Sequence, residues 1–213
     1  MTLSPNLPSA ACRSLRLGDV APNFSARTTM GVKSLSDYRG RWLILFSHPA
    51  DFTPVCTTEF VALAKGAHQF EALNCALLAL SVDSLYAHIA WVKAIEQSHN
   101  VTVPFPIIED PSMAIGRAYG MIDEYAADSS AIRCAYFIDP DGTVRAMTSY
   151  PYNVGRSVAE MLRMLAALQI AMTDNVLTPE GWQPGDATMP PPVSDISQAG
   201  ASADWFCKTD DGA

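Results

Sequence analysis

The sequence predicts an α/β fold, a sheet flanked by helices, followed by a C-terminal extension. Between residues 23 and 168, apolar runs of strand length alternate with segments of helical period, which is typical of such a sheet. Beyond about residue 169 the composition changes, and prolines interrupt a polar tract. A chain of 213 residues that is 49% hydrophobic can bury a sizeable core. We therefore expect one domain over residues 1–169 and a C-terminal arm over residues 170–213.

The first elements are a hairpin and a central strand. Residues 23–28 and 32–35 flank Met30 and Gly31, a pattern that predicts two strands joined by a tight turn. Residues 41–47 form an apolar run, which we expect to be a strand buried on both faces.

A helix should follow almost at once. From Thr57 onward, apolar residues recur at helical spacing, at Phe60, Leu63, Ala67 and Phe70. Cys56 is therefore expected in or beside the first turn of this helix.

The remaining elements continue the alternation. We expect two strands, over residues 75–82 and 104–108. We also expect one helix over residues 84–97 and another that starts at Asp110 and ends near Gly120.

Two further strands and a helix should complete the domain. Residues 134–139 and 143–150 predict strands around the turn at residues 140–142, and residues 156–168 an amphipathic helix. In the arm, Trp205, Phe206 and Cys207 form a compact apolar group, which we expect to dock on this chain or on a second subunit.

Charge and composition exclude several classes of partner. The net charge of −8 argues against nucleic acid or an anionic membrane as the main partner. No apolar run approaches the roughly 20 residues of a spanning helix, and the N-terminal segment lacks the features of a secretory signal. We therefore expect a cytoplasmic protein. Its five cysteines lack CxxC spacing, which predicts neither a disulfide framework nor a zinc site, and we expect no metal or cofactor.

Cys56 is the strongest candidate for chemistry. It lies where an apolar strand breaks into a helix, so its sulfur would meet the positive end of the helix dipole and unpaired backbone N–H groups, which favour a thiolate. Cys75 and Cys134 instead open apolar runs and are expected to be buried packing residues, while Cys12 lies in a Pro- and Ser-rich start.

The segment around Cys56 resembles the active site of a known family. Pro49-x-x-x-Thr53-x-x-Cys56 is similar to the motif of the peroxiredoxins, thiol peroxidases with a thioredoxin-like fold. The resemblance covers residues 17–169 and continues more weakly into the arm. Residues 47–56 and the Trp-Phe-Cys group look most like the one-cysteine-type subfamily, especially its archaeal and bacterial members. This resemblance implies a thioredoxin-like fold with a central mixed sheet flanked by helices, and an arm that contributes to dimerisation.

The resemblance also implies roles at the reacting centre. Cys56 would be the nucleophile, Thr53 would accept a hydrogen bond from the peroxide, and Pro49 would shield the pocket from water without adding a donor. Arg133, just before the strand at residues 134–139, matches the family's catalytic arginine, which would stabilise charge on the sulfur and on the leaving oxygen.

Three further residues would support the centre. Glu59 is expected to pair with Arg156 and to buttress the site from behind. His48 would lie close to the pocket, where it could tune the sulfur, although a purely structural histidine remains an open alternative.

The implied reaction is the reduction of hydrogen peroxide and alkyl hydroperoxides through a sulfenic acid on Cys56. The second half stays open: an external thiol, such as thioredoxin or a small thiol, could reduce the sulfenic acid, or Cys207 of a partner subunit could resolve it as a disulfide. Relatives form dimers that often assemble into decameric rings, so a homodimer is expected here and a decamer stays open.

Other functions remain to be compared. A disulfide oxidoreductase would need a CxxC pair, which the chain lacks. A redox-regulated oligomeric holdase or signalling scaffold stays open as an alternative. Some one-cysteine relatives carry a lipase-like serine in a Gly-Asp-Ser-Trp segment, but residues 39–42 read Arg-Gly-Arg-Trp, so we expect no phospholipase activity.

Overall fold

The computed structural model describes residues 15–122, 129–196 and 206–207. The chain separates into two compact units, Met1–Arg156 and Ser157–Ala213. Among the described helices, none combines the length and apolar character needed to cross a bilayer.

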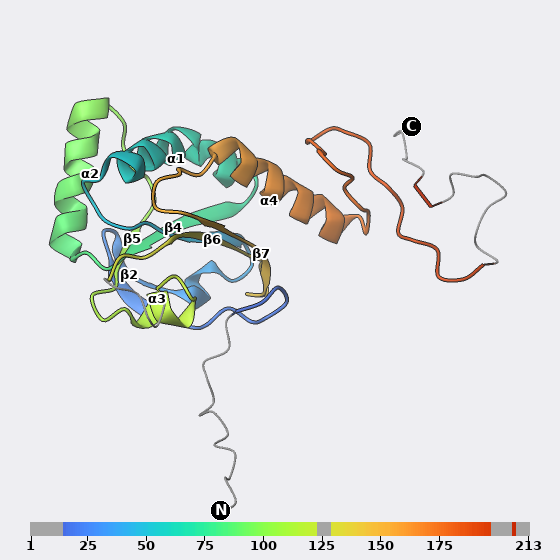
Figure 1. Cartoon of the computed structure of the whole chain (residues 1–213), viewed down its shortest axis with the longest axis horizontal. Coiled ribbons are helices and arrows are strands. Elements are labelled where there is room, and N and C mark those ends of the chain that lie inside the picture. The colour runs from blue at the N-terminus through green and yellow to red at the C-terminus, as the bar shows by residue number, and fades with distance from the viewer. Residues whose placement is uncertain (1–14, 123–128, 197–205, 208–213) are drawn as a thin grey trace, which may run out of the picture. The chain divides into compact units, whose positions relative to one another are not determined.

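The first unit is built on a seven-stranded mixed sheet (Figure 1). Its spatial order is β2-β1-β5-β4-β3-β6-β7. Strand β3 is parallel to β4 and β4 to β5, whereas all other neighbours are antiparallel. The strands are β1 (Ser25–Thr28), β2 (Gly31–Ser34), β3 (Trp42–Ser47), β4 (Cys75–Ser81), β5 (Ile107–Glu109), β6 (Arg133–Ile138) and β7 (Val144–Tyr150).

Helices cover both faces of this sheet. The helices are η1 (Leu35–Tyr38), α1 (Pro54–Ala72), α2 (Leu85–His99) and α3 (Ala114–Ala118). The crossovers from β3 to β4 and from β4 to β5 step in the same direction, so right-handed connections place α1 and α2 on one face. Helix α3 lies on the opposite side (Figure 1).

The strand pairing brings the ends of β3 and β6 together. All six residues of β3 are buried, as expected for a central strand. Because β6 runs antiparallel to β3, with Phe46 opposite Ala135, Arg133 at the start of β6 lies near the end of β3. The backbone N–H of Cys134 donates to Ser47 Oγ at 3.2 Å and ties the two ends.

The observed elements agree with most sequence predictions. The hairpin is present, with Gly31 at a φ of +83° in its turn. Helix α1 begins at Pro54, slightly earlier than Thr57, and Cys56 lies in its first turn as predicted.

Two predicted elements are shorter than expected. The strand predicted at residues 104–108 is observed as β5, which begins at Ile107. The helix predicted from Asp110 starts only at Ala114, because Met113 has a left-handed φ of +60° and the Asp110 carboxylate accepts from Gly116 N at 2.7 Å. The Asp110 carboxylate thus caps the first turn of α3 from outside the helix.

The second unit contains α4 (Val158–Thr173) and the beginning of the arm. The Ser157 side chain caps α4 by accepting from Glu160 N. In the arm, Trp182 is buried and its Nε1 donates to Asp186 O at 3.1 Å. Helix α4 runs past residue 169. The boundary expected between the domain and the arm at this residue stays a prediction.

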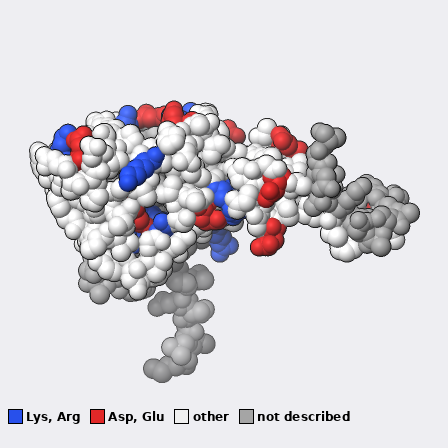
Figure 2. Space-filling model, turned by 90° about the horizontal axis from the view of Figure 1, so that it is seen from above, with Lys and Arg blue, Asp and Glu red and all other residues white. Residues whose placement is uncertain are grey.

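Some residues with expected roles lie outside the described ranges. Cys12 and Trp205 belong to them, so their packing remains a prediction. Phe206 and Cys207 are described and exposed. Figure 2 shows a face of the molecule on which basic and acidic side chains are interspersed among uncharged ones.

Candidate active site

The sulfur of Cys56 lies at the N-terminal end of α1. Thr53 is the N-cap residue with an extended backbone, and Pro54 occupies the first turn, where its missing N–H costs nothing. The Thr53 side chain does not cap the helix, so the amides of Val55 and Cys56 keep no intrahelical partner. Cys56 is fully buried. The helix end therefore presents positive charge to a sulfur that is shielded from water.

Arg133 contacts this sulfur directly. Its Nη1 lies 3.2 Å from Cys56 Sγ and also donates to Glu59 Oε2 at 2.9 Å. Its Nε donates to the carbonyl oxygen of Tyr152 at 3.0 Å, and its side chain is only 1% exposed. The guanidinium is thus held from two sides with an N–H directed at the sulfur.

Glu59 joins Arg133 to Arg156, as predicted for the Glu59–Arg156 pair. Arg156 donates to both carboxylate oxygens of Glu59, from Nε at 3.0 Å and from Nη2 at 2.8 Å. Its Nη1 also donates to the carbonyl oxygen of Cys134 at 2.8 Å. Burial alone would raise the pKa of Glu59, but the hydrogen bonds and charges of Arg156 and Arg133 outweigh it and hold this pKa below its usual value. Glu59 is therefore an anion between two buried cations.

We expect Glu59→Gln to lower the free energy of unfolding by about 3 kcal/mol at pH 7, because it leaves two buried guanidinium groups without their counter-charge. The folded pKa of Glu59 lies below its ordinary value of 4.5. This contribution to stability is therefore complete above the unfolded pKa and disappears as the pH falls through the folded pKa. Urea denaturation of both proteins between pH 3 and 7 measures it.

Glu71→Gln is the matched control, since Glu71 also bonds an arginine, Arg41, but its side chain is 72% exposed. Its cost should stay within about 1 kcal/mol. If both substitutions lowered the free energy of unfolding equally, burial of the Glu59 ion pairs would not add to stability.

Thr53 and Pro49 also lie in the loop between β3 and α1. Thr53 Oγ1 donates to the carbonyl oxygen of Ala50 at 2.9 Å, which leaves its lone pairs available to accept. Pro49 is buried. Phe52, between them, has a left-handed φ of +56° although it is not glycine, so this loop holds a strained backbone.

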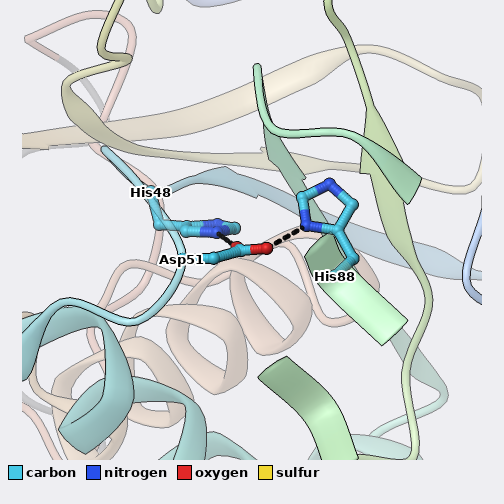
Figure 3. A group of neighbouring side chains, drawn as sticks. All are labelled: His48, Asp51 and His88. Atoms are coloured by element: carbon cyan, nitrogen blue, oxygen red, sulfur yellow. Dashed lines mark hydrogen bonds and ion pairs between the residues drawn. The ribbon is translucent and has the colours of Figure 1, made fainter. Parts of the chain in front are cut away.

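His48 belongs to a buried group with Asp51 and His88 (Figure 3). Its Nε2 lies 2.8 Å from Asp51 Oδ1, and His88 Nδ1 lies 2.7 Å from Asp51 Oδ2. Burial lowers the pKa of His48 despite its hydrogen bond to Asp51. Burial raises the pKa of Asp51, but the bonds from both histidines outweigh it and hold that pKa below its usual value.

These three side chains also carry atoms that could hold a metal. Their nitrogen and oxygen atoms lie within 4.8 Å of one another, and no other such group occurs among the described residues. Asp51 lies between the two histidines, and both contacts have hydrogen-bond length, so the geometry is that of a hydrogen-bonded chain.

The other described cysteines differ from Cys56. Burial raises the pKa of Cys75 to about 12 and also raises the pKa of Cys134, as expected for packing residues. Cys207 is an exposed free thiol of the second unit.

One cavity of the first unit is remote from the Cys56 sulfur. It has a volume of about 560 Å³ and lies where β3 and β4 begin, at the end of these strands opposite to Cys56. None of the site residues predicted from the sequence lines it.

Sequence reasoning missed Asp51, His88 and Tyr152. Tyr152 contributes its backbone carbonyl and an aromatic ring whose centroid lies 5.8 Å from Arg133 Cζ, and no local pattern in the sequence marks either contact. His88 lies on the buried face of α2 with Trp91 and Ile95. The sequence carries no clear signal for it, because the neighbouring apolar residue Ile89 is exposed.

The chain matches two known sequence families. Residues 17–147 match the AhpC/TSA family, and residues 167–199 match the C-terminal domain of 1-Cys peroxiredoxin. A peroxiredoxin of Methanosarcina mazei is 45% identical over 186 residues, which cover 84% of this chain and 85% of the relative. A peroxiredoxin of Aquifex aeolicus is 43% identical over 212 residues, covering 91% and 96%.

Solved structures show the same fold. A yeast mitochondrial 1-Cys peroxiredoxin, studied for thiol resolution via glutathione and thioredoxin systems, matches with a TM-score of 0.80 at 39% identity, covering 90% of this chain and 92% of that one. A cysteine-to-serine mutant of peroxiredoxin 6 from Arenicola marina matches with a TM-score of 0.80 at 34% identity, covering 87% and 88%.

Proposed function

Because the chain belongs to the AhpC/TSA family of peroxiredoxins and is a thiol-dependent peroxidase, we propose that Cys56 is the sulfur that reduces the peroxide. The observation that carries this proposal is the contact of 3.2 Å between Arg133 Nη1 and Cys56 Sγ at the start of α1. A buried cation and a helix N-terminus both stabilise the thiolate over the thiol.

The reaction follows from these contacts. The thiolate attacks one oxygen of the hydroperoxide, the O–O bond breaks, and the other oxygen leaves with its electron pair and takes up a proton. The products are a sulfenic acid on Cys56 and water or an alcohol. Arg133 stabilises the charge that moves from sulfur to the leaving oxygen, and Glu59 with Arg156 holds Arg133 in place.

Thr53 would accept a hydrogen bond from the hydroperoxide and orient it for attack. Thr53→Val keeps the side-chain shape but removes the hydroxyl, and we expect the second-order rate constant for oxidation of Cys56 to fall about 100-fold. Thr53→Ser, which keeps the hydroxyl, should stay within a few-fold of wild type. Stopped-flow measurements on both variants test this, and equal rates for Thr53→Val and wild type would remove Thr53 from the reacting centre.

Reduction of the sulfenic acid needs a second thiol and an opening of the site. Cys56 is fully buried, so a thiol can reach it only after the structure around it opens locally. Cys207 is exposed in the arm, and this supports its role as a resolving thiol from a partner subunit. Thioredoxin or a small thiol is the other reductant in the proposal.

Assembly and location also belong to the proposal. A homodimer is supported by β7, which is the last strand of the described sheet and pairs with a neighbour on one side only. The association of such dimers into a decamer follows the resemblance to relatives alone. A cytoplasmic location is supported by the reduced cysteines that the cycle requires.

Turnover with two reductants tests this function. Wild type should consume hydrogen peroxide with dithiothreitol and with thioredoxin, whereas Cys207→Ser should lose thioredoxin turnover but keep dithiothreitol turnover. After one equivalent of peroxide, wild type should also form a covalent dimer on a non-reducing gel. Equal thioredoxin turnover in both proteins would exclude Cys207 as the resolving thiol, and no turnover with either reductant would contradict the proposed reaction.

A further inference from the structure

The cavity at the end of β3 opposite to Cys56 has the size of a small-molecule site. It lies where β3 and β4 begin, with Trp42 paired to Cys75, and its volume is about 560 Å³. Small-molecule sites typically measure roughly 300–1,000 Å³. Helix α1 carries Cys56 in its first turn and lines the cavity near its other end with His68 and Glu71. At about 1.5 Å per residue, His68 lies about 18 Å along the helix axis from Cys56, so the two places are separate.

Most of the cavity's lining is apolar. Ala64 and Ala67 of α1 and Ala76 of β4 present only methyl groups, which leaves the space that larger side chains would fill. Residues 104–106, with the sequence Pro-Phe-Pro, form another part of the lining. Cys75 belongs to the apolar part as well, because burial raises its pKa to about 12 and keeps its thiol uncharged. Such a lining favours the apolar part of a ligand.

Two buried polar atoms of the same lining have no hydrogen-bond partner among the described residues. They are the hydroxyl oxygen of Tyr38 and Nε of Arg41. Arg41 donates from Nη2 to Glu71 Oε2 at 2.8 Å, so its guanidinium is held in place while its Nε–H remains unpaired. Buried polar groups are nearly always hydrogen-bonded, so two such atoms in one cavity indicate a group that binds there.

Both atoms are hydrogen-bond donors at neutral pH. The Nε of an arginine has no lone pair with which to accept. Burial, and to a smaller extent the charge of Asp37, raises the pKa of Tyr38 to about 12, so its hydroxyl keeps its proton. The charge of Arg41 acts on the Tyr38 hydroxyl, which shows that the two groups are near each other. The group that they lack is therefore an acceptor.

The charges around the cavity favour an anionic acceptor. Lys33 and Arg41 are cations, and His68 also lines the cavity. Among the described residues of the lining, the acidic side chain is Glu71, which is 72% exposed and already bound to Arg41. Hydrogen bonds from a guanidinium to an anion are shorter and stronger than those between neutral groups.

We propose that this cavity binds a small carboxylate with an apolar body, whose oxygens accept from Tyr38 and Arg41 and whose body lies against the alanines of α1 and residues 104–106. A carboxylate fits because its two oxygens accept several hydrogen bonds and carry the charge that the lining favours. The apolar body fits because most of the lining offers no polar group. This site is independent of Cys56 and does not rest on the proposed peroxidase reaction.

Calorimetric titration of the full-length reduced protein with 2-naphthoate tests the site. We expect one equivalent to bind with a dissociation constant of about 0.1–1 mM. Two further probes separate the parts of the ligand: 2-naphthamide has nearly the same shape without the charge, and inorganic phosphate has the charge without the apolar body. Each should bind at least about 10-fold more weakly. Equal binding of either probe would overturn the ligand class, and the absence of saturable 2-naphthoate binding would overturn the site, since water would then satisfy the two donors.

Amide NMR spectra of the ¹⁵N-labelled protein locate the bound 2-naphthoate. The largest chemical-shift changes should fall on residues 64–71 and 104–106, whereas the amides of Thr53 and Cys56 should stay unchanged. Changes centred on Cys56 would overturn the proposal, because the anion would then occupy the reacting centre beside Arg133.

Substitutions of the two donors test their roles. Arg41→Met should lower the affinity for 2-naphthoate about 10-fold or more, and Tyr38→Phe, which removes only the hydroxyl, about 3- to 10-fold. Arg145→Met makes the same change of net charge outside the cavity and should bind as wild type does. Wild-type affinity in Arg41→Met, or equal losses in Arg41→Met and Arg145→Met, would overturn the proposal.

Peroxide reduction distinguishes failure of this inference from failure of the proposed function. All three variants should keep the rate constant for Cys56 oxidation within about two-fold of wild type, because none of these residues contacts the sulfur or Arg133. Loss of 2-naphthoate binding with unchanged oxidation is the result expected for Arg41→Met. Should this variant not fold, Tyr38→Phe and the wild-type titration decide.

Discussion

Cys56→Ser should lose peroxide reduction by at least about 10⁴-fold, the largest effect that we expect from any single substitution. Serine keeps nearly the same shape at this buried position, so Arg133 retains a partner and the fold should persist. A serine hydroxyl is not ionised at neutral pH, and the helix end and one guanidinium do not make it a competent nucleophile without an adjacent base. The initial rate of hydrogen peroxide consumption with dithiothreitol measures the loss.

Cys75→Ser is the matched control for this prediction. Cys75 is equally buried, but its pKa is raised to about 12, so its thiol should remain unreactive at neutral pH. The control should keep wild-type peroxide consumption in whatever fraction folds. If Cys56→Ser retained a large part of the activity while Cys75→Ser lost it, the assignment of the nucleophile would be wrong.

Arg133→Met should reduce the rate constant for Cys56 oxidation by about 10²- to 10³-fold. Methionine keeps much of the side-chain length but removes the N–H directed at the sulfur and the charge that stabilises the leaving oxygen. Glu59 keeps its bonds to Arg156, so the buried carboxylate is not left without a partner. Stopped-flow fluorescence with increasing peroxide gives the rate constant.

Arg133→Lys and Arg145→Met sharpen this result. Arg133 donates to Cys56, to Glu59 and to the Tyr152 carbonyl at once, and a single ammonium group cannot reproduce this fork, so lysine should recover only part of the rate. Arg145 is a half-exposed arginine paired with Asp139, and Arg145→Met should leave the rate unchanged. If Arg133→Met and Arg145→Met lowered the rate constant for Cys56 oxidation equally, the effect would come from the net charge of the protein and not from the contact of Arg133 with the sulfur.

The sequence predicted where Cys56 lies because the residues around it follow local rules. An apolar strand that breaks at a proline-containing loop before a helical period places Cys56 in a first turn, and the structure confirms this position. The contact of Arg133 with Cys56 could be predicted only from the family resemblance. The antiparallel register of β3 and β6, which brings the two residues together, cannot be read from either strand alone. The contact between Glu59 and Arg156, 97 residues apart, depends on the same information.

The missed features depend on tertiary contacts. On α2, the apolar residue Ile89 is 43% exposed, whereas His88 is buried, so the apolar pattern did not mark the buried face. The late start of α3 depends on the Asp110 carboxylate and the left-handed Met113, neither of which a helical period reveals. These positions are decided by hydrogen bonds of buried polar groups, and such bonds override local propensity.

In the proposed reaction, the buried sulfur beside Arg133 receives an oxygen atom of the peroxide. The most direct measurement treats the reduced protein with one equivalent of hydrogen peroxide in the presence of dimedone and maps the adduct by peptide mass spectrometry. We expect the sulfenic acid adduct on Cys56, formed faster than any adduct on the exposed Cys207. Adduct formation at Cys207 with Cys56 still reduced would contradict the account.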